Sequence, residues 1–298
     1  MQKIAITGAT GFTGRYLATL LQERGYAVYG LIHKANDDQG MALECLSCDL
    51  TDPASIARTL DAVRPDKIVH LAAVSFVAHE DVDALYRTNV IGTRNLLQAA
   101  VNSHLPINNV LLASSANIYG NRTTGILTED TEPAPVNDYA VSKLAMEYVG
   151  KMYADRLPII TVRPFNYTGV GQSVNFLIPK IVDHIRRRAP YIELGNLDVA
   201  RDFSDVRAVA ATYIALLEER STIGDVYNIC SGRAYTLKDV INMAEIISGH
   251  SIEVRVNSAF VRDNEVKTLS GSRRRLDDFC QNLPNPPLEE TLRWMLGA

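Results

Sequence analysis

The chain has 298 residues, a formal net charge of −4 and 47% hydrophobic residues, enough to bury a sizeable core. This charge balance offers no basic face for nucleic acid, and no run of about 18 apolar residues could span a membrane. The first predicted strand begins directly after the N-terminus, so we expect no signal peptide, and the four cysteines suggest free thiols in a cytoplasmic protein.

In chain order, strand patterns alternate with helical patterns through the first 165 residues. An apolar run at residues 4–6 predicts a first strand, and Leu17, Leu20 and Leu21 share one face of the helix that follows. Further strands are predicted at 28–32, 43–47, 67–71, 110–113 and 159–163, with helices at 53–63, 82–103 and 139–156. The alternation predicts an α/β fold with a doubly wound parallel sheet that is covered by helices on both faces.

After residue 165 the pattern loosens into shorter elements, with helices near 176–188, 206–219, 236–248 and 288–296. We therefore expect a dinucleotide-binding domain over 1–165 and a smaller C-terminal α/β substrate lobe over 166–298. Some segments of the second part should return to the first domain, and the active site should lie between the two.

A glycine-rich segment, Thr7-Gly8-Ala9-Thr10-Gly11-Phe12-Thr13-Gly14, joins the first strand to the first helix. Gly8 permits a tight turn, Gly11 lets the backbone approach a pyrophosphate, and Gly14 lets the helix lie close to the sheet. The phosphates would bind at the helix N-terminus, where N–H groups and the helix dipole favour anions. The order of strand, glycines and helix therefore predicts a dinucleotide site.

The segment Tyr139-Ala140-Val141-Ser142-Lys143 places a phenol and an ammonium four residues apart, on one face of a predicted helix. A nearby cation favours the phenolate, so we expect Lys143 to lower the pKa of Tyr139 toward a range useful for acid–base catalysis.

Together these motifs make the chain resemble the extended short-chain dehydrogenases/reductases, over nearly its whole length and with a Rossmann-type fold implied. His70-Leu71-Ala72-Ala73 resembles the family segment that lies over the cofactor, and Ser114-Ser115-Ala116-Asn117-Ile118-Tyr119-Gly120 resembles the segment that carries the catalytic hydroxyl. The resemblance implies a catalytic triad of Ser115, Tyr139 and Lys143. It implies cofactor contacts at Gly8, Thr10, Gly11, Phe12, Thr13, Gly14, Asp49, Leu50, Leu71, Ala72, Ala73, Tyr139 and Lys143.

The end of the second predicted strand bears on the choice between NADP(H) and NAD(H). NAD-binding relatives usually carry an acidic residue there, whereas this chain has His33 and Lys34, and no carboxylate before Asp37. A basic pair suits the 2′-phosphate of NADP(H), so NADP(H) is preferred and NAD(H) stays possible. The alternative is that both side chains are solvated loop residues.

The positions after the catalytic hydroxyl narrow the reaction. Family members that act as sugar-nucleotide 4,6-dehydratases carry an acid one or two positions beyond it, where this chain has Ala116 and Asn117. Neither is a general base at neutral pH, so the dehydratase interpretation loses its key residue.

Segments in the second half resemble those of GDP-sugar enzymes of the family, and the overall match is closest to the GDP-4-keto-6-deoxy-D-mannose reductases. Arg201 and Arg262 would contact the GDP, and Glu265 would hold ribose hydroxyls. Asp263 replaces the usual proline, and Tyr167 and Val170 also depart from the pattern. The implied substrate-binding residues are Ser75, Asn117, Asn166, Asn175, Arg201, Arg262 and Glu265.

The predicted reaction is NADPH-dependent reduction of the C4 ketone of a GDP-4-keto-6-deoxyhexose, giving GDP-D-rhamnose or its C4 epimer GDP-6-deoxy-D-talose. An epimerase that retains NAD(P), a 4,6-dehydratase, a substrate linked to dTDP, UDP or CDP, and a non-catalytic NAD(P)-binding regulator remain alternatives. No metal is expected, because Cys45-x-x-Cys48 lies on a predicted strand without a second pair at ligand spacing.

The resemblance also implies a homodimer paired through the helices at 82–103 and 139–156. Their small and apolar residues would form the interface; these include Ala99, Ala100, Ala140, Ala145 and Met146. The alternative is that this apolar face packs on the sheet of its own chain.

Overall fold

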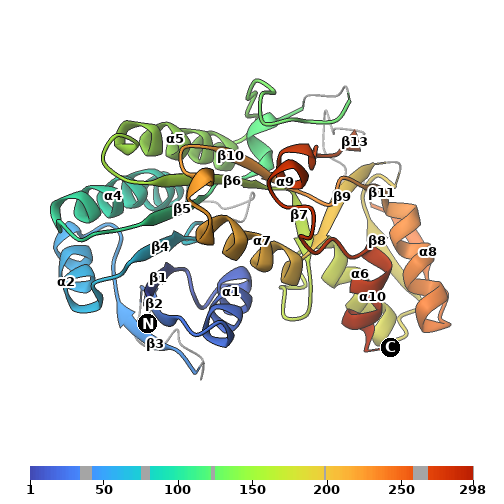
Figure 1. The fold of residues 1–298 in the computed structure, drawn as a ribbon. Helices are drawn as coiled ribbons and strands as arrows, with labels where there is room; N and C mark the ends of the chain where they lie inside the picture. Colours follow the sequence, from blue (N-terminus) through green and yellow to red (C-terminus); the bar gives the residue numbers. More distant parts are fainter. Residues whose placement is uncertain (34–41, 75–80, 122–124, 198, 258–267, 298) are drawn as a thin grey trace. The chain divides into compact units, whose positions relative to one another are not determined.

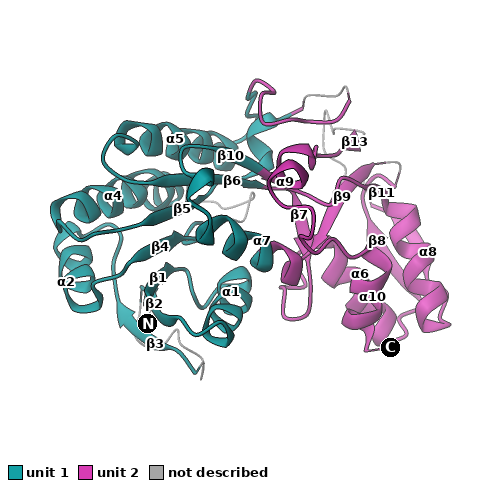
Figure 2. Ribbon diagram, viewed as in Figure 1, with its two compact units in different colours: residues 1–120, 133–163, 210–227 teal, residues 121–132, 164–209, 228–298 magenta. Residues whose placement is uncertain are grey.

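The computed structural model describes residues 1–33, 42–74, 81–121, 125–197, 199–257 and 268–297. The chain forms two compact units (Figure 2). Unit 1 comprises residues 1–120, 133–163 and 210–227, and unit 2 comprises 121–132, 164–209 and 228–298. The chain thus passes more than once between the units.

Unit 1 is built on a seven-stranded sheet with the order β10-β6-β5-β4-β1-β2-β3 (Figure 1). The neighbouring pairs from β6 to β3 are all parallel. The strands are β1 (Lys3–Thr7), β2 (Ala27–Ile32), β3 (Glu44–Ser47), β4 (Lys67–His70), β5 (Asn109–Ala113), β6 (Ile159–Pro164) and β10 (Val226–Ile229). This order, 3-2-1-4-5-6 with one further strand, confirms the predicted Rossmann-type sheet, and it changes direction between β1 and β4.

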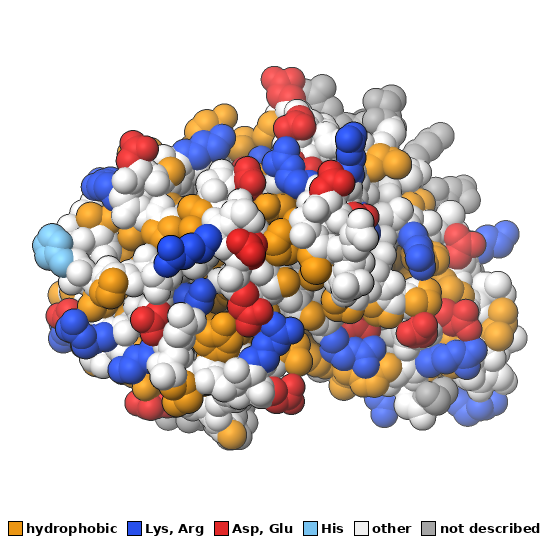
Figure 3. Space-filling view, in the orientation of Figure 1, with side chains coloured by type: hydrophobic (Ala, Val, Ile, Leu, Met, Phe, Trp, Pro, Cys, Tyr) orange, Lys and Arg blue, Asp and Glu red, His pale blue; other side chains and the backbone are white. Residues whose placement is uncertain are grey.

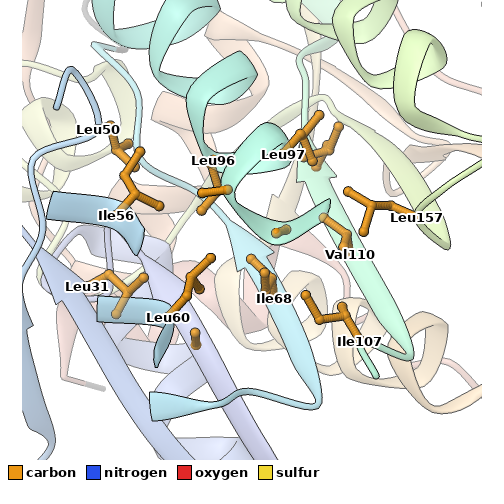
Figure 4. Close-up of a cluster of buried hydrophobic side chains, with 14 of the residues drawn as sticks. Leu31, Leu50, Ile56, Leu60, Ile68, Leu96, Leu97, Ile107, Val110 and Leu157 are labelled. Atoms are coloured by element: carbon orange, nitrogen blue, oxygen red, sulfur yellow. The ribbon is translucent and has the colours of Figure 1, made fainter. Parts of the chain in front are cut away.

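Helices cover both faces of this sheet (Figure 1). One face carries α2 (Pro53–Val63), α4 (Thr93–Asn102) and α5 (Asp138–Tyr153), and the other carries α1 (Phe12–Glu23) and α7 (Val206–Glu218). Apolar side chains fill the space under the first three helices, as Figure 4 shows for Leu60, Ile68 and Leu96. Continuous burial of β4 and β5 agrees with a parallel sheet covered on both faces.

The helix predicted over 82–103 is interrupted. It consists of α3 (Val82–Tyr86), a π-helical segment η2 (Arg87–Gly92) and then α4. Within η2, Asn89 and Gly92 are buried, and a Cβ on Gly92 would lie 3.1 Å from Leu50 Cβ. A π-helical turn holds one more residue than an α-helical turn, and it turns Asn89 inward toward the site described below.

Unit 2 holds two smaller sheets and a helical cluster. A four-stranded sheet has β9 (Ala200–Asp205) at its centre, paired with β7 (Asn166–Thr168), β11 (Ala234–Thr236) and β13 (Thr268–Leu269). A parallel pair joins β8 (Tyr191–Leu194) to β12 (Glu253–Val256). The helices are α6 (Leu177–Arg186), α8 (Leu237–Ser248), α9 (Arg274–Phe279) and α10 (Leu288–Leu296). Short 3-10 helices in the described part of the chain include η3 (Ala116–Tyr119) and η4 (Arg220–Thr222).

A buried carboxylate fixes β9 within unit 2. Asp202 is fully buried, and its side chain accepts hydrogen bonds from the backbone of Ser231, Gly232 and Gly271 and from the Ser231 hydroxyl, at 2.7–3.4 Å. Since buried charge is costly without such donors, these bonds hold two separate segments, at 231–232 and at Gly271, against the strand that carries Arg201.

Acidic and basic side chains are interspersed on the face shown in Figure 3, in keeping with the small net charge. No helix among the described residues is both long and apolar enough to cross a membrane.

Candidate active site

The glycine-rich segment forms a tight loop at the carboxyl end of β1. Gly8 has φ +71°, a left-handed conformation that favours glycine, and the Gly11 amide donates to the Gly8 carbonyl at 3.0 Å. A Cβ on Gly14 would lie 2.3 Å from the Gly8 oxygen, so only glycine lets α1 begin this close to the loop. Gly11 is the N-cap of α1 and has no side chain that could cap the first amides.

The loop after β4 lies directly against this glycine loop. A Cβ on Gly8 would lie 2.8 Å from the Ala72 nitrogen, and the amides of Leu71 and Ala72 donate to the Thr7 carbonyl and hydroxyl, each at 3.2 Å. Two loops therefore meet where the sheet order changes direction, which is the place where open α/β sheets bind dinucleotides. The bare backbone at Gly8 and Gly11 and the start of α1 fit a pyrophosphate in the way the sequence predicts. Thr10, Phe12, Thr13 and Ala73 lie in these same two loops or at the start of α1.

The tip of β2 carries His33, whose side chain is largely exposed. His33 Nδ1 lies 3.9 Å from Asp49 Oδ1. The Asp49 carboxylate also accepts from the Thr51 hydroxyl and amide, at 2.7 and 2.8 Å, and these hydrogen bonds are the main reason that the pKa of Asp49 is lowered. Leu50, predicted at the cofactor, is buried in the core beneath α4. Lys34, Ser75, Arg262 and Glu265 lie outside the described residues.

Ser115 follows β5 and is the N-cap of η3. Its Oγ accepts two hydrogen bonds from Asn117, from the backbone amide at 3.2 Å and from the side-chain Nδ2 at 3.1 Å. With its lone pairs engaged in this way, the hydroxyl hydrogen is directed to a third partner. The geometry thus makes Ser115 a hydrogen-bond donor.

Helix α5 carries Tyr139 and Lys143 on its buried face. Its first turn is capped by Asn137, whose side chain accepts from the Ala140 amide at 2.9 Å. Lys143 is 3% exposed, and its Nζ donates to the Ala113 carbonyl at 2.8 Å, two residues before Ser115. Burial lowers the pKa of Lys143 to about 8, against an opposing effect of Glu147. The structure thus places Ser115 between β5 and η3, at the carboxyl end of the sheet, and Tyr139 and Lys143 on α5.

His70 links the cofactor loop to helix α4. Its Nδ1 lies 2.7 Å from Thr7 Oγ1 and its Nε2 lies 2.8 Å from Thr93 Oγ1. The Thr93 hydroxyl donates to the Asn89 carbonyl at 2.7 Å, so it must accept from Nε2–H, and Nδ1 must accept from Thr7. His70 is therefore neutral with its proton on Nε2. Full burial, with a smaller contribution from the Lys143 cation, lowers the pKa of His70 to about 3.

Asn89 and Ser142 extend the chain of hydrogen bonds that runs through His70 and Thr93. Neither residue was predicted as a site residue. Asn89 Nδ2 donates to Ser142 Oγ at 3.0 Å, and Ser142 donates to the Tyr139 carbonyl at 2.8 Å. The Asn89 amide also binds the backbone of Val74, at 2.9 and 3.1 Å. No local sequence signal marked Asn89, because its partners Val74 and Ser142 are distant in the sequence.

In unit 2, two predicted substrate residues lie on neighbouring strands. Asn166, on β7, donates to the Asp202 carbonyl at 3.4 Å, and Arg201, on β9, donates to the Ala200 carbonyl at 2.9 Å. Asn175 is exposed in the turn before α6, where its amide donates to Ser173 Oγ at 3.3 Å. The structure therefore brings Asn166 and Arg201 into one sheet.

A surface cavity of about 450 Å³ lies elsewhere in unit 2, between α6, the 169–174 loop and Met295. None of the predicted substrate residues lines it, so we do not assign the substrate there. In the part of the chain that the structure describes, no group of three or more His, Cys, Asp or Glu side chains could hold a metal ion.

The fold and these motifs define a Rossmann-type nucleotide-cofactor enzyme, and comparison with known proteins identifies its family. Residues 4–230 match the NAD dependent epimerase/dehydratase family, and the chain belongs to that family. This confirms the predicted membership of the extended short-chain dehydrogenases/reductases.

The chain is 38% identical to the GDP-6-deoxy-D-talose 4-dehydrogenase of Aggregatibacter actinomycetemcomitans, covering 94% of this chain and 92% of the relative. It is 31% identical to the GDP-6-deoxy-D-mannose reductase of Pseudomonas aeruginosa, covering 99% and 96%. Among solved structures, that of RMD from Pseudomonas aeruginosa complexed with NADPH superposes with a TM-score of 0.86 at 30% identity, covering 100% of this chain and 98% of that chain. A Burkholderia cenocepacia protein, provisionally designated an epimerase, superposes with a TM-score of 0.93 at 50% identity, covering 99% and 97%.

His70→Gln should flatten the acid dependence of stability. The folded pKa of His70, about 3, lies below its ordinary value of 6.5, so below pH 6.5 the unfolded chain binds a proton that the folded chain does not. Stability from this group is thus fully present above pH 6.5 and is lost as the pH falls toward 3, by at most about 1.4 kcal/mol per pH unit. Urea unfolding at pH 7, 6 and 5 measures the slope.

The variant should be less stable than wild type at pH 7, and this difference should shrink at pH 5. The exposed His104, changed to Asn, serves as the control and should leave the slope as in wild type. Parallel slopes for wild type and His70→Gln would contradict a neutral His70.

Proposed function

We propose that this protein reduces the C4 ketone of a GDP-4-keto-6-deoxyhexose with NADPH, giving GDP-6-deoxy-D-talose or GDP-D-rhamnose. The observation that carries the proposal is the donor arrangement at the carboxyl end of β5: a serine hydroxyl turned into a donor by Asn117, beside a helix with Tyr139 and a buried Lys143. The two GDP-sugar relatives act on the corresponding kind of substrate by their names.

The three catalytic residues have distinct tasks in this reaction. Tyr139 gives its phenolic proton to the oxygen that becomes an alkoxide, and the Lys143 cation stabilises the phenolate left behind. Ser115 donates a hydrogen bond to the same oxygen and stabilises its developing charge. Bound NADPH would supply the hydride; Gly8, Gly11 and the start of α1 would hold its pyrophosphate, and Lys143 its nicotinamide ribose.

NADP(H) is the proposed cofactor, with NAD(H) as the alternative. The RMD structure is a complex with NADPH, whereas several epimerase structures of similar fold contain NAD. In this chain the described tip of β2 presents the His33 imidazole, which suits a 2′-phosphate better than a ribose hydroxyl. An epimerase that retains its cofactor is the second candidate function, and the match to epimerases of the family supports it.

Net consumption of the reduced cofactor separates the two functions. With a panel of nucleotide-4-ketosugars, wild type should oxidise NADPH stoichiometrically with the GDP-linked ketone and should use NADH less efficiently. Tyr139→Phe should lower kcat by about 10²–10⁴-fold, because only the phenolic proton is lost, and should retain NADPH binding by fluorescence titration.

NMR of the product assigns the configuration at C4. Conversion of the sugar without loss of NADPH would support the epimerase instead. A Tyr139→Phe rate within about threefold of wild type would remove Tyr139 from the acid role.

Unit 2 is the proposed substrate lobe, with Arg201 and Arg262 as the contacts to the GDP diphosphate. Arg201 lies on the strand held by the Asp202 hydrogen bonds, so its backbone position is fixed. Arginine suits this role because its planar guanidinium matches phosphate oxygens.

Arg201→Ala and Arg262→Ala should each weaken GDP binding by roughly ten- to a hundredfold, since a charge-assisted contact is worth about 1.5–3 kcal/mol. NADPH binding should stay near the wild-type value, because unit 1 holds the proposed cofactor loop. Calorimetry with both ligands on each variant measures this, with the exposed Arg186→Ala as the control. Equal losses of GDP and NADPH would show a role in folding and no diphosphate contact.

A homodimer through α5 and its neighbours is also proposed, on a different set of residues from that in the sequence argument. Ala99, Ala100, Ala140 and Met146 are buried within their own unit and cannot form an interface, because their face packs on the sheet. The opposite face of α5 exposes an apolar stripe of Val141, Tyr148 and Met152, at 39%, 58% and 67% exposure, and Ile91 of η2 is 46% exposed.

Light scattering at micromolar concentration should give twice the monomer mass for wild type. Met152→Lys should shift the mass toward the monomer, since it places a charge in the apolar stripe. Ile246 on α8 is 70% exposed, and Ile246→Lys is the matched control that should stay dimeric. A monomeric wild type would refute the dimer.

A further inference from the structure

A buried arginine joins the two elements that carry the proposed catalytic groups. Arg163 on β6 forms a bidentate pair with Glu147, Nε to Oε1 at 2.9 Å and Nη2 to Oε2 at 2.8 Å. Its Nη1 donates to the Tyr119 hydroxyl at 3.0 Å. The side chains of Arg163 and Glu147 are 7% and 3% exposed, and Tyr119 is fully buried. Glu147 lies one helical turn beyond Lys143 on α5, and Tyr119 is the last residue of η3, which Ser115 caps.

The Glu147 carboxylate therefore lies within reach of two buried cations. It raises the pKa of Lys143 against the larger lowering by burial, so Lys143 senses its charge. A buried carboxylate is costly unless it is paired, and the planar fork of Arg163 occupies both of its oxygens. Lys143 instead directs its Nζ to the Ala113 carbonyl.

Removal of the arginine would change this balance. The carboxylate would then be left with the buried Lys143 ammonium one helical turn away on α5. Attraction over one turn of the helix would favour the charged lysine and would draw Nζ away from Ala113, the strand residue beside the Ser115 segment.

We propose that Arg163 is a positioning residue that keeps Glu147 from becoming the counter-ion of Lys143, and so holds the Lys143 ammonium at the Ala113 carbonyl beside Tyr139. This inference rests on the proposed role of Lys143 in ketone reduction. Arg163, a strand residue whose side chain binds Glu147 and Tyr119, would thus control the charge state of the helix that carries Lys143.

The other titratable groups around Lys143 come from several elements. His70 on β4 is held neutral by its hydrogen bonds, and Tyr139 is on the same helix face. Tyr119 on η3 accepts from Arg163, and Tyr86 of α3 donates to Asp138 at 3.0 Å at the exposed start of α5. Among these groups, Glu147 and Arg163 form the only oppositely charged pair that is buried in the described structure around Lys143.

Titration of Lys143 itself tests the inference without any substrate. Lysine labelled with ¹³C at Cε would be followed by NMR as the pH rises, with the Lys143 signal assigned by its absence in Lys143→Met. Arg163→Gln leaves Glu147 uncompensated and should move the Lys143 titration to higher pH by about one unit. Glu147→Gln removes the anion and leaves the Arg163 cation, and should move it to lower pH by a similar amount. The Arg163→Gln/Glu147→Gln double variant should return close to wild type.

The alkaline limb of the kcat/KM profile for ketone reduction should follow the Lys143 titration in all three variants. Arg207→Gln is the matched control, because it breaks another ion pair, Arg207 to Asp205 at 2.6 Å in unit 2, and should leave the Lys143 titration unmoved. A purely structural role would lower kcat and the melting temperature in both single variants without opposite shifts, and that result would overturn the proposal.

Two outcomes separate this inference from the proposed function. If the titration shifts occur and no nucleotide-4-ketosugar is reduced, the proposed function fails and the electrostatic role stands. If ketone reduction occurs and the titration stays fixed, the role of Arg163 is refuted. If Arg163→Gln does not fold, the proposal still requires two results. The Lys143 titration should move to lower pH in Glu147→Gln, and it should stay near wild type in Arg163→Lys.

Discussion

Helix α5 approaches strand β5 so closely at Gly150 that a Cβ there would lie 2.8 Å from Leu112 Cδ1. Two turns earlier on the same buried face, this close packing brings Lys143 Nζ to the Ala113 carbonyl. The ammonium is thereby removed from water and anchored by backbone, so its pKa falls because of burial and its position is fixed by the sheet. The rest of the site depends on this contact, since it sets α5 relative to the strand that leads to Ser115.

A chain of hydrogen bonds between uncharged groups is a second constraint on the positions of the site residues. From Thr7 beside the glycine loop, hydrogen bonds lead through His70, Thr93 and Asn89 to Ser142 and the Tyr139 carbonyl. Each hydroxyl and ring nitrogen has a defined direction in this path, which permits only one tautomer of the histidine. Buried polar contacts thus join the glycine loop, which would hold a pyrophosphate, to α5, which carries the proposed acid Tyr139. Such contacts tolerate little displacement of either element.

The sequence was sufficient for the parts of the fold that follow from periodicity and spacing. The alternation of strands and helices predicted the parallel sheet, and the spacing of Tyr139 and Lys143 predicted a shared helix face, which α5 provides. It could not place the π-helical segment, because nothing local distinguishes Asn89 from an ordinary helix residue until Val74 and Ser142 lie beside it. Nor did it separate the buried face of α5 from the exposed stripe, because both faces carry apolar residues; only packing shows that Met146 is inside and Met152 outside.

In the proposed reaction, the polarity of one side chain favours reduction over dehydration. An amide at position 117 donates to Ser115 Oγ, and the serine hydrogen is left for a substrate oxygen. A carboxylate in the same place would accept from the serine and compete with the substrate for that hydrogen, while offering a base for proton abstraction. The same backbone frame can therefore serve either chemistry, and in the proposed reaction Asn117 favours the one in which Ser115 and Tyr139 donate to a ketone oxygen.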